Sequence, residues 1–394
     1  MDDIQLKIEN AIANIPAASW NQLERFDNPF LSWTWLNGFE ANACTGARKG
    51  WHPMHLTLWR GPQLIAACPT YLKGDSMGEF VFDQEWAAFA RSLGIQYYPK
   101  VLVAVPFTPA SGPRFLTEPN DDRPQLIRIL AAALVQVTQQ SKYSSVHINF
   151  CREDESEALR ELGFLERHSV QFHWENQNYA SFDDYLGALK SKRRKQIKRE
   201  RRLLAEAGVS FRHISGDQIT PDIMSQSFQF YRDHVERFHW GRLYLSEDFF
   251  QYIGTHFKDH LHLVFAEKDQ EAIGWAMLVE GGGTLYGRYW GHRGPKQDYL
   301  HFATCYYEGI SRCISAGLNS FEPGAGGEFK RLRGFEPVIT TSFHYLVDER
   351  MHQAVGNFLQ QEARMVGNYR DTLLEHSQFR DDAYSPSPCG KPSN

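Results

Sequence analysis

A carboxylate, a run of glycines and several cations lie close together in the segment NSFEPGAGGEFKRLRGFEP. A strand is expected over NSFE and ends in Glu322. Gly324 and Gly326 follow in a turn that favours positive φ or the close approach of a ligand. Lys330 and Arg333 come next. A buried carboxylate with a raised pKa can accept a proton, and the cations can hold an anion. The segment predicts one wall of a cleft; a tight turn with surface charges is the alternative.

The preceding strand, YGRYWG, carries Arg288 and Tyr289. The next helix is expected to start near Leu300 and to place His301 in its first turn. Free backbone N–H groups at a helix start can hold an anion. We expect this strand, the helix start and the glycine turn to line one pocket. Cys305 follows His301 by four residues on the same helix face, so a cysteine nucleophile is a further possibility.

Positive charge is concentrated in LKSKRRKQIKRERR, where nine Lys or Arg and one acid fall between Lys190 and Arg202. The chain as a whole has a formal net charge of −5, so the remainder sums to −13. Such a local charge argues against coating of DNA and favours a discrete anionic ligand or a small RNA patch. Apolar spacing predicts one helix from about Phe182 to the capping Gly208, with Arg193 facing the interior and needing an anion. The alternative is a solvated charged face.

A second group of polar residues lies in the first half of the chain. In YLKGDSMGEFVFDQEW, Glu79 and Asp83 share one face of an extended segment, with Val81 between them. The loop PFTPASGPRF is rich in proline and is expected to fix the direction of Arg114. Rigid loops often hold ligands, so Arg114 is a candidate binding residue. The alternative is a structural corner in which Arg114 caps carbonyls.

Composition indicates a folded protein without special targeting. The 394 residues are 42% hydrophobic and 14% aromatic, which is enough for a large core and suggests two domains. The sequence shows no apolar run of membrane-spanning length and no signal-peptide pattern at its start. Six cysteines form no CxxC pair and sixteen histidines form no HExxH pattern, so no metal site is expected. We expect a cytoplasmic protein in a reducing compartment of bacterial type.

An internal repeat organises these motifs. Hairpins are expected at 55–72 and 262–279, and each is followed by a strand, a helix, another strand and a Gly-Phe pair. Two copies of one α/β unit, joined near 175–180, explain this order. The expected division is 1–177 for the first domain, 178–350 for the second, 351–378 for a C-terminal helix and 379–394 for a disordered tail.

Several long blocks carry a resemblance to a known family. NPFLSWTWLNGFE, YLKGDSMGEFVFDQEW, YWGHRGPKQDYLHFATCYYEGI and FEPGAGGEFKRLRGFEPVITTSFHYL resemble, in this order, blocks of the FemAB-like family of bacterial N-acyltransferases. The resemblance runs from about Trp20 to Glu375. It implies an α/β (α+β) fold of two tandem acetyltransferase-like (GNAT) domains, each a mixed β-sheet flanked by helices. It also implies transfer of acyl or aminoacyl groups, for example onto a cell-wall (peptidoglycan) precursor.

The chain departs from ordinary acetyltransferases at one motif. They bind the acyl-CoA pyrophosphate with a Q/R-x-x-G-x-G/A turn, where this chain has HRGPKQDYLHF. Either Arg293, Lys296 and the helix start at Leu300 hold the donor phosphate, or the donor is not CoA. We therefore expect no tightly bound cofactor, with acyl-CoA or aminoacyl-tRNA as co-substrate. The expected partners are a small-molecule amine or cell-wall precursor and tRNA, but not DNA.

Acyl transfer to an amine requires a neutral amine, a stabilised oxyanion and a proton for the leaving group. Glu322 is expected to accept the amine proton. Backbone N–H groups near Tyr289 would face the oxyanion, with Arg288 or Lys330 as auxiliary charge. Binding of substrate or donor is assigned to Arg114, Arg193, Arg194, His301, Gly324, Gly326 and Arg333.

Two other interpretations remain open at this point. Tyr306 or Tyr307 could protonate the leaving group, although tyrosines on an apolar helix commonly belong to the core. A protein of a different class, which binds RNA or a partner on the same scaffold without catalysis, would depend on the basic run and tolerate the loss of Glu322.

Overall fold

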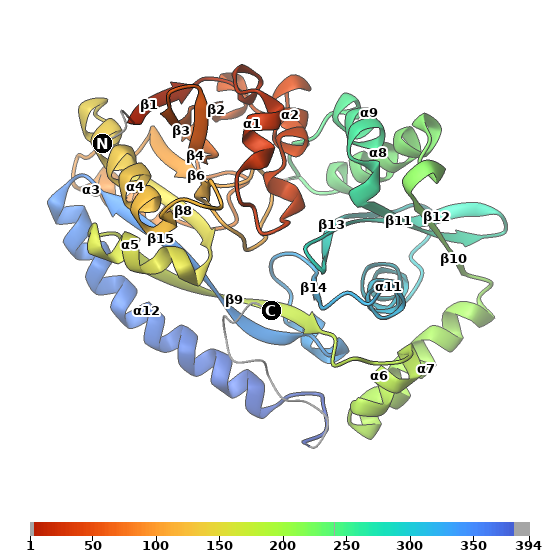
Figure 1. The fold of residues 1–394 in the computed structure, drawn as a ribbon. Helices are drawn as coiled ribbons and strands as arrows, with labels where there is room; N and C mark the ends of the chain where they lie inside the picture. The colour runs from red at the N-terminus through yellow and green to blue at the C-terminus, as the bar shows by residue number, and fades with distance from the viewer. Residues whose placement is uncertain (1–3, 240, 382–394) are drawn as a thin grey trace. The chain divides into compact units, whose positions relative to one another are not determined.

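The computed structural model describes residues 4–239 and 241–381, which form two compact units (Figure 1). The first unit comprises Met1–Val170 with Ile339–Asn368, and the second comprises Gln171–Val338 with Tyr369–Asn394. The sequence predicts two continuous domains, 1–177 and 178–350. The units of the structure are instead discontinuous, because the chain returns to the first unit after Val338.

The first unit contains two β-sheets. One has the strand order β1-β3-β4-β7, and the other has the order β2-β5-β6-β8, with β15 added antiparallel to β8. β6 and β8 are parallel to each other. The strands are β1 (Ile4–Glu9), β2 (Trp51–Pro53), β3 (His55–Arg60), β4 (Gln63–Cys68), β5 (Thr70–Lys73), β6 (Lys100–Val103), β7 (Leu116–Thr117), β8 (Ser145–Cys151) and β15 (Glu336–Leu346).

Helix α4 covers the main apolar core of the first unit. It begins after Asp122, whose side chain accepts a hydrogen bond from Gln125 N at 3.1 Å, and a proline occupies its first turn. Its buried residues, such as Leu130 and Leu134, pack with residues of β3, β4, β6 and β8. The helices are α1 (Ala17–Gln22), α2 (Trp33–Ala41), α3 (Gln84–Ser92), α4 (Arg123–Gln140) and α5 (Ser156–Glu161), with 3₁₀ turns η1 (Ile12–Asn14), η2 (Pro29–Leu31), η3 (Ala47–Lys49) and η4 (Glu153–Glu155).

The second unit is built on one sheet with the order β10-β11-β12-β13-β14-β9. β13 and β14 are parallel, and their neighbours pair antiparallel. The apolar runs of β11 and β12 are buried on both faces, as expected for strands covered by helices on each side. The strands are β9 (Leu165–Glu175), β10 (Ser210–Ser215), β11 (Leu261–Lys268), β12 (Glu271–Gly281), β13 (Thr284–His292) and β14 (Ser320–Glu322).

Helices lie on both faces of this sheet (Figure 1). A Cβ on Gly291 of β13 would meet Phe230 of α8, whereas one on Gly274 of β12 would meet Leu300 of α10. The helical elements are α6 (Phe182–Ala188), α7 (Ser191–Glu206), η5 (Gly216–Gln218), α8 (Pro221–Glu236), α9 (Glu247–His256), η6 (Lys258–His260), α10 (Leu300–Phe302), η7 (Ala303–Tyr307), α11 (Glu308–Ala316) and η8 (Glu328–Arg333). The last helix, α12 (Glu349–Glu375), belongs to the first unit as far as Asn368. The predicted helix from Leu300 to Ala316 is therefore present, with a π-helical segment, η7, inside it.

The two units repeat one order of elements and both predicted hairpins form, but the hairpins do not occupy equivalent positions, so the predicted match of 55–72 with 262–279 is wrong. The first unit has β2-β5-β6-β8 with α4 before the last strand; the second has β11-β12-β13-β14 with α11 before the last strand. The first hairpin differs in being divided between two sheets. Its residues before Pro69 pair as β3 and β4, and the chain then continues as β5 in the other sheet. Proline lacks the N–H that would continue the ladder, which explains the break.

The basic run does not form the single helix predicted from Phe182. α6 ends at Ala188, and α7 begins at Ser191, because Leu189 and Lys190 adopt extended ψ values of 151° and 141°. The break changes the angular phase of the second helix relative to the first. The apolar residues expected to face the interior, Leu186, Leu189, Ile197 and Leu204, are nonetheless buried.

Among the residues that the structure describes, every helix is too short or too polar to cross a membrane. The predicted C-terminal helix corresponds to α12. The predicted tail begins at Phe379, and most of it lies outside the described residues.

Candidate functional site

The two parallel strands of the second unit separate at the end of β14. Thr284–Tyr286 pairs with Ser320–Glu322, and β13 then continues to His292 without β14 beside it. Pro323 follows the end of β14. Its backbone lies so close to Gly287 that an added Cβ would come within 3.1 Å. A small residue is therefore required where the two strands part.

A β-bulge lies on β13 just after this point. Met277 pairs with Tyr289 and Leu278 pairs with Gly287, so Arg288 is an extra residue opposite β12. A bulge increases local twist and redirects the backbone and side chains, and bulges are common beside active sites. The strand around Tyr289, whose backbone N–H groups were expected to face the oxyanion, is therefore bulged. It lies next to the end of its parallel neighbour, β14.

Glu322 lies beside a histidine that the sequence did not single out. β9 runs antiparallel to β14 on the side away from β13, with Phe321 opposite Trp174. This register brings Nε2 of His173 to 4.0 Å from Oε2 of Glu322, and each of these two side chains is 14% exposed. Burial, with a smaller contribution from the charge of Lys330, lowers the pKa of His173 to about 3. The imidazole is therefore neutral at physiological pH.

Arg288 is a buried cation in the same group. Burial lowers the pKa of its guanidinium, whereas the side chains of Tyr289 and Glu322 act in the opposite direction. The pairing of Tyr286 with Glu322 places Arg288 two residues further along the neighbouring strand. The predicted proximity of Arg288, Tyr289 and Glu322 is thus what the structure has.

The glycine turn and Lys330 form the next part of the site. Gly324 and Gly326 have φ values of +90° and +71°, in the region that favours glycine. The ammonium of Lys330 donates to the carbonyl oxygens of Gly324 at 2.6 Å and Ala325 at 3.2 Å. Burial lowers the pKa of Lys330 to about 8. The turn is therefore closed over a buried ammonium whose hydrogen bonds go to backbone carbonyls.

Cys305 has the wrong electrostatics for a nucleophile. Burial raises the pKa of its thiol, which the charge of Lys330 only partly offsets, so the reactive thiolate is disfavoured. The ring of His301 lies against Trp290, at 5.0 Å between centroids, and against Tyr306 at 5.3 Å. Burial lowers the pKa of His301 to about 4. His301 is thus part of an aromatic group.

Arg333 belongs to a buried ion pair with the basic helix. Its Nη2 lies 3.4 Å from Oε2 of Glu200, and its guanidinium lies over the ring of Phe302, 3.4 Å from the centroid. The hydroxyl of Tyr307 donates to the same carboxylate, and Gln196 donates to its other oxygen at 2.9 Å. Tyr307 is therefore engaged away from the Glu322 group, and Arg333 joins η8 to α7.

The inward face of α7 contains the apolar residues predicted for it and one buried acid. Ile197, Glu200 and Leu204 are buried, whereas Arg193 is only half-buried. Arg193 Nη1 donates to Gln196 at 3.0 Å, so the interior charge on this helix is the single acid of the basic run. Arg193 lies one turn before Ile197 on this same face, as predicted, but it is only half-buried at the start of α7, so the fully buried charge of the helix is Glu200.

Arg194 lines a different, open cavity of about 500 Å³ at the junction of α6 and α7. Tyr179, Asp184 and Arg380 also line it. This cavity includes none of the Glu322 group, so the structure does not bring Arg194 to that group.

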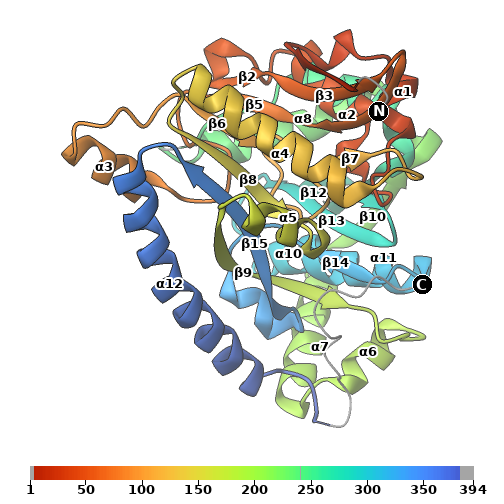
Figure 2. The ribbon, with the colours of Figure 1, turned by 60° about the vertical axis from the view of Figure 1, so that its left-hand side comes forward.

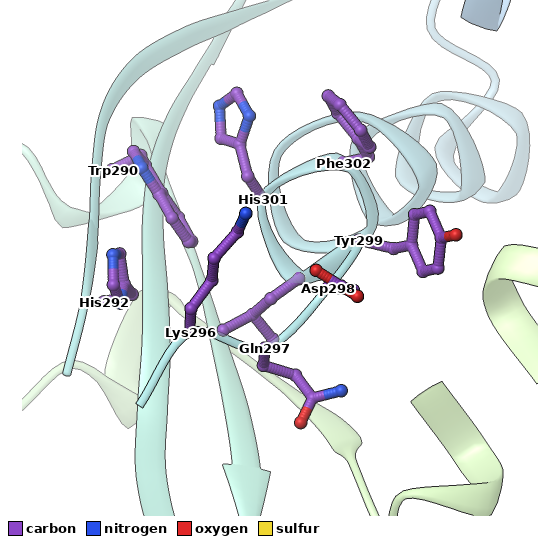
Figure 3. Close-up of a pocket in the computed structure, with 9 residues that line it drawn as sticks. Trp290, His292, Lys296, Gln297, Asp298, Tyr299, His301 and Phe302 are labelled. Carbon is purple, nitrogen blue, oxygen red and sulfur yellow. The ribbon is translucent and has the colours of Figure 1, made fainter. Parts of the chain in front are cut away.

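A cavity of about 410 Å³ opens where β13 ends and α10 begins (Figure 3). Trp290 and His292 from β13, Lys296 from the loop and His301 from α10 project around it. The remaining lining residues are Gln297, Asp298, Tyr299, Leu300 and Phe302. A donor phosphate is expected at this position. The lining residues include neither Arg288 nor any residue of the Glu322–Arg333 turn, so this cavity is not the single pocket predicted for the strand, the helix start and the turn. Lys296 lines the cavity, but Arg293 is not among the lining residues and is paired with Asp233, 2.7 Å from Nε to Oδ2.

Arg114 lies in the first unit and is fully enclosed by backbone. Its guanidinium donates to the carbonyl oxygens of Asn149 at 2.6 Å, Ala110 at 2.7 Å, Pro113 at 2.9 Å and Gly112 at 3.1 Å. Only 1% of the residue is exposed. These contacts correspond to the structural corner that was the alternative interpretation of the loop.

The second unit therefore assembles Glu322, Arg288, Tyr289, Lys330 and the two glycines around the end of β14. It adds His173, which sequence reasoning missed. A histidine in an alternating strand gives no sign of its partner, because the β9–β14 register links residues far apart in the chain.

Comparison with known proteins gives a family and a fold. A FemAB-like family model, described as peptidoglycan biosynthesis/recognition, matches residues 11–381. The crystal structure of FemX is similar, with a TM-score of 0.52, 12% identity and coverage of 90% of this chain and 100% of that chain. The C-terminal domain of an Agrobacterium fabrum protein described as a lysylphosphatidylglycerol synthetase has a TM-score of 0.51, 10% identity and coverage of 86% and 93%. No curated protein matches the chain.

Proposed function

The chain belongs to the FemAB-like family, and on that premise we propose that it moves an acyl or aminoacyl group from an activated donor to the nitrogen of an amine. Its fold is α/β with two acetyltransferase-like (GNAT) domains in tandem, and it is a transferase. The proposal concerns the transferred group, the donor and the acceptor.

The separation of β13 and β14 carries the proposal. The strands part after Tyr286 and Glu322, and the bulge at Arg288 follows at once on β13. Backbone N–H groups of a strand that has left its neighbour can donate to a carbonyl oxygen as it becomes an oxyanion. The buried guanidinium of Arg288 supplies positive charge close to this position. The arrangement suits a reaction in which negative charge develops on an acyl oxygen.

The proton transfers use groups on either side of the gap. The acceptor nitrogen attacks the donor carbonyl carbon and forms the C–N bond. Glu322 takes the proton from that nitrogen, directly or through water. The C–S bond of a thioester or the C–O bond of an aminoacyl ester then breaks, and the leaving atom keeps the electron pair and takes up the proton that Glu322 accepted, directly or through water. Neutral His173, 4.0 Å from the carboxylate, is placed to orient Glu322.

Two features bear on the donor. The cavity beside the start of α10 presents Lys296 together with aromatic rings, which suits the phosphate and base of a nucleotide-bearing donor. The exposed cations of α7, among them Lys195 and Arg199, suit a longer polyanion. Acyl-CoA would use the first feature, whereas aminoacyl-tRNA would use both. The family description favours a cell-wall precursor as the acceptor.

The test is a transfer assay with matched variants. Purified protein is incubated with a nucleotide-linked muropeptide precursor and either an acyl-CoA mixture or a charged tRNA pool, and products are identified by mass spectrometry. With the donor that reacts, Glu322→Gln should lower kcat about 10²- to 10⁴-fold and leave KM nearly unchanged. Glu328→Gln, which alters an exposed carboxylate of the same turn, should retain activity. Full turnover by Glu322→Gln would reject the assignment.

A further inference from the structure

Residues 77–93 of the first unit form a segment with inverted polarity. Glu79 and Asp83 are buried, with 4% and 1% of their surface exposed, whereas Phe82 is 69% exposed. Phe80, between the two acids, also faces outward. Water favours the reverse arrangement, with charges outside and aromatic rings inside. Such a segment is suited to an apolar environment on its outer side.

Cationic and hydroxyl side chains on the inner side of the segment contact the two buried carboxylates. The ammonium of Lys100 lies 2.8 Å from Oε2 of Glu79 and 2.5 Å from Oδ2 of Asp83. The hydroxyl of Tyr97 donates to the same oxygen of Asp83 at 2.6 Å. The ammonium of Lys73 lies 3.9 Å from Oε1 of Glu79 and supplies the second positive charge. These contacts hold the segment against β6 and keep both carboxylates away from its outer surface. The outer surface is therefore both apolar and poor in charge.

Helix α3 continues the outward apolar surface while its other face is anchored. Trp86 and Ala90 are buried in a cluster with Met351 and Val355 of α12. Figure 2 shows α3 and its two connecting segments at the outside of the first unit, next to the start of α12. The outward residues besides Phe82 are Met77, Phe80, Phe89 and Leu93, which are 40%, 38%, 41% and 36% exposed. Five large apolar side chains thus share a short, projecting element.

Backbone strain at Phe80 supports a role outside the fold itself. Its φ is +61°, a region that a residue with a bulky side chain adopts only at a cost of about 1–3 kcal/mol. That conformation turns the ring outward while Glu79 points inward to Lys100. Folding alone gains nothing from an exposed ring at a strained position.

Cations border this apolar surface. Arg48 and Lys49 are exposed on η3, and no ion pair involves either of them within the described part of the chain. The chain after η3 lies along the loop that begins the segment, since Trp51 Nε1 donates to Met77 O at 3.2 Å. Arg91 is exposed on α3 itself. The exposed acid Glu85 is the counter-charge on the same helix.

We propose that residues 77–93 are a membrane-docking element, which inserts Phe80, Phe82 and Phe89 into the interfacial region of an anionic lipid bilayer while Arg48, Lys49 and Arg91 contact the headgroups. Apolar side chains that enter the interface leave water, and basic residues at its edge add attraction to anionic lipids. An apolar ligand pocket would enclose the rings, whereas here they project from a convex element. This role is independent of the transfer reaction proposed for the second unit.

The test is cosedimentation of the full chain with sucrose-loaded vesicles. Vesicles of phosphatidylcholine with about one third phosphatidylglycerol are compared with phosphatidylcholine alone. The wild type should bind the anionic vesicles, and the triple variant Phe80→Asn, Phe82→Ser, Phe89→Ser should bind about tenfold more weakly or less. Asparagine tolerates positive φ, and all three sites are exposed, so the variant should keep its far-UV circular dichroism and Tm.

Matched controls separate this surface from others. Phe358→Ser with Met365→Ser removes exposed apolar side chains from α12 of the same unit and should leave vesicle binding unchanged. Arg48→Gln with Lys49→Gln should weaken binding and reduce its salt dependence. If the triple variant binds vesicles like the wild type, or if only substitution of the α7 cations weakens vesicle binding, the proposal is wrong. Self-association that the triple variant abolishes, without vesicle binding by the wild type, would instead identify a dimer interface and overturn it.

Discussion

His173 Nε2 lies 4.0 Å from Glu322 Oε2, across the antiparallel pair of β9 and β14. The histidine is neutral because burial lowers its pKa to about 3, so it can share a proton or a water with the carboxylate without a full charge of its own. Nε2 of His173 also lies 3.1 Å from Oε1 of Gln171, so the histidine is held by its own strand as a polar neighbour of the proposed base.

This relationship predicts coupling between the two residues. His173→Gln should lower kcat about tenfold, because Glu322 loses its orienting neighbour. The double variant with Glu322→Gln should be no slower than Glu322→Gln alone, since the histidine acts through the carboxylate. A double-mutant cycle on kcat measures this. Effects that simply multiply would show that His173 acts on something other than Glu322.

Lys330 should make stability depend on pH in the alkaline range. Its pKa falls from the usual 10.5 to about 8 on folding, so between these values the unfolded chain binds more protons and the free energy of unfolding rises with pH. The buried charge costs on the order of 3 kcal/mol below about pH 8, and this cost disappears toward pH 10.5. Comparison of urea unfolding of the wild type and Lys330→Met should show that the wild type gains stability relative to the variant across this range. A constant difference would mean that Lys330 keeps its usual pKa.

Glu200 should matter more for stability than any cation of the basic run. Glu200→Gln leaves Arg333 buried without its counter-charge, and the free energy of unfolding should fall by about 3 kcal/mol. Arg193→Gln alters a half-buried residue that donates to two glutamines and should cost less than about 1 kcal/mol. Urea unfolding at one pH compares the two. The opposite ranking would restore Arg193 as the inward charge.

The outer cations of α7 should affect binding and not folding. Lys195→Gln, Lys198→Gln, Arg199→Gln and Arg202→Gln together change exposed residues, of which Lys198 pairs with Asp183 and Arg202 with Glu206. Tm should change little, because exposed ion pairs stabilise weakly. Affinity for tRNA should fall, and the slope of log affinity against log salt should become shallower. Unchanged affinity and slope in filter binding would leave α7 as a solvated helix face.

The sequence predicted those features that depend on neighbours in the chain. Apolar strands around a short polar turn predicted the two hairpins, and the glycines after Glu322 predicted the positive-φ turn. Inward and outward alternation from Glu79 to Asp83 also follows from a local period of two. A repeated order of such elements was enough to indicate two similar units.

The tertiary structure decided everything that depends on register or phase between distant segments. His173 meets Glu322 only because β9 pairs with β14 in one register, and a shift of a single residue would turn it to the other face. Glu200 is the fully buried charge of α7 because Arg333 and Tyr307 contact its carboxylate. Arg114 is occupied by carbonyls that its loop and β8 bring together. Local periodicity specifies which residues share a face of one element. The partner that each face meets is selected by the free energy of packing and hydrogen bonding over the whole unit, which no single stretch of sequence contains.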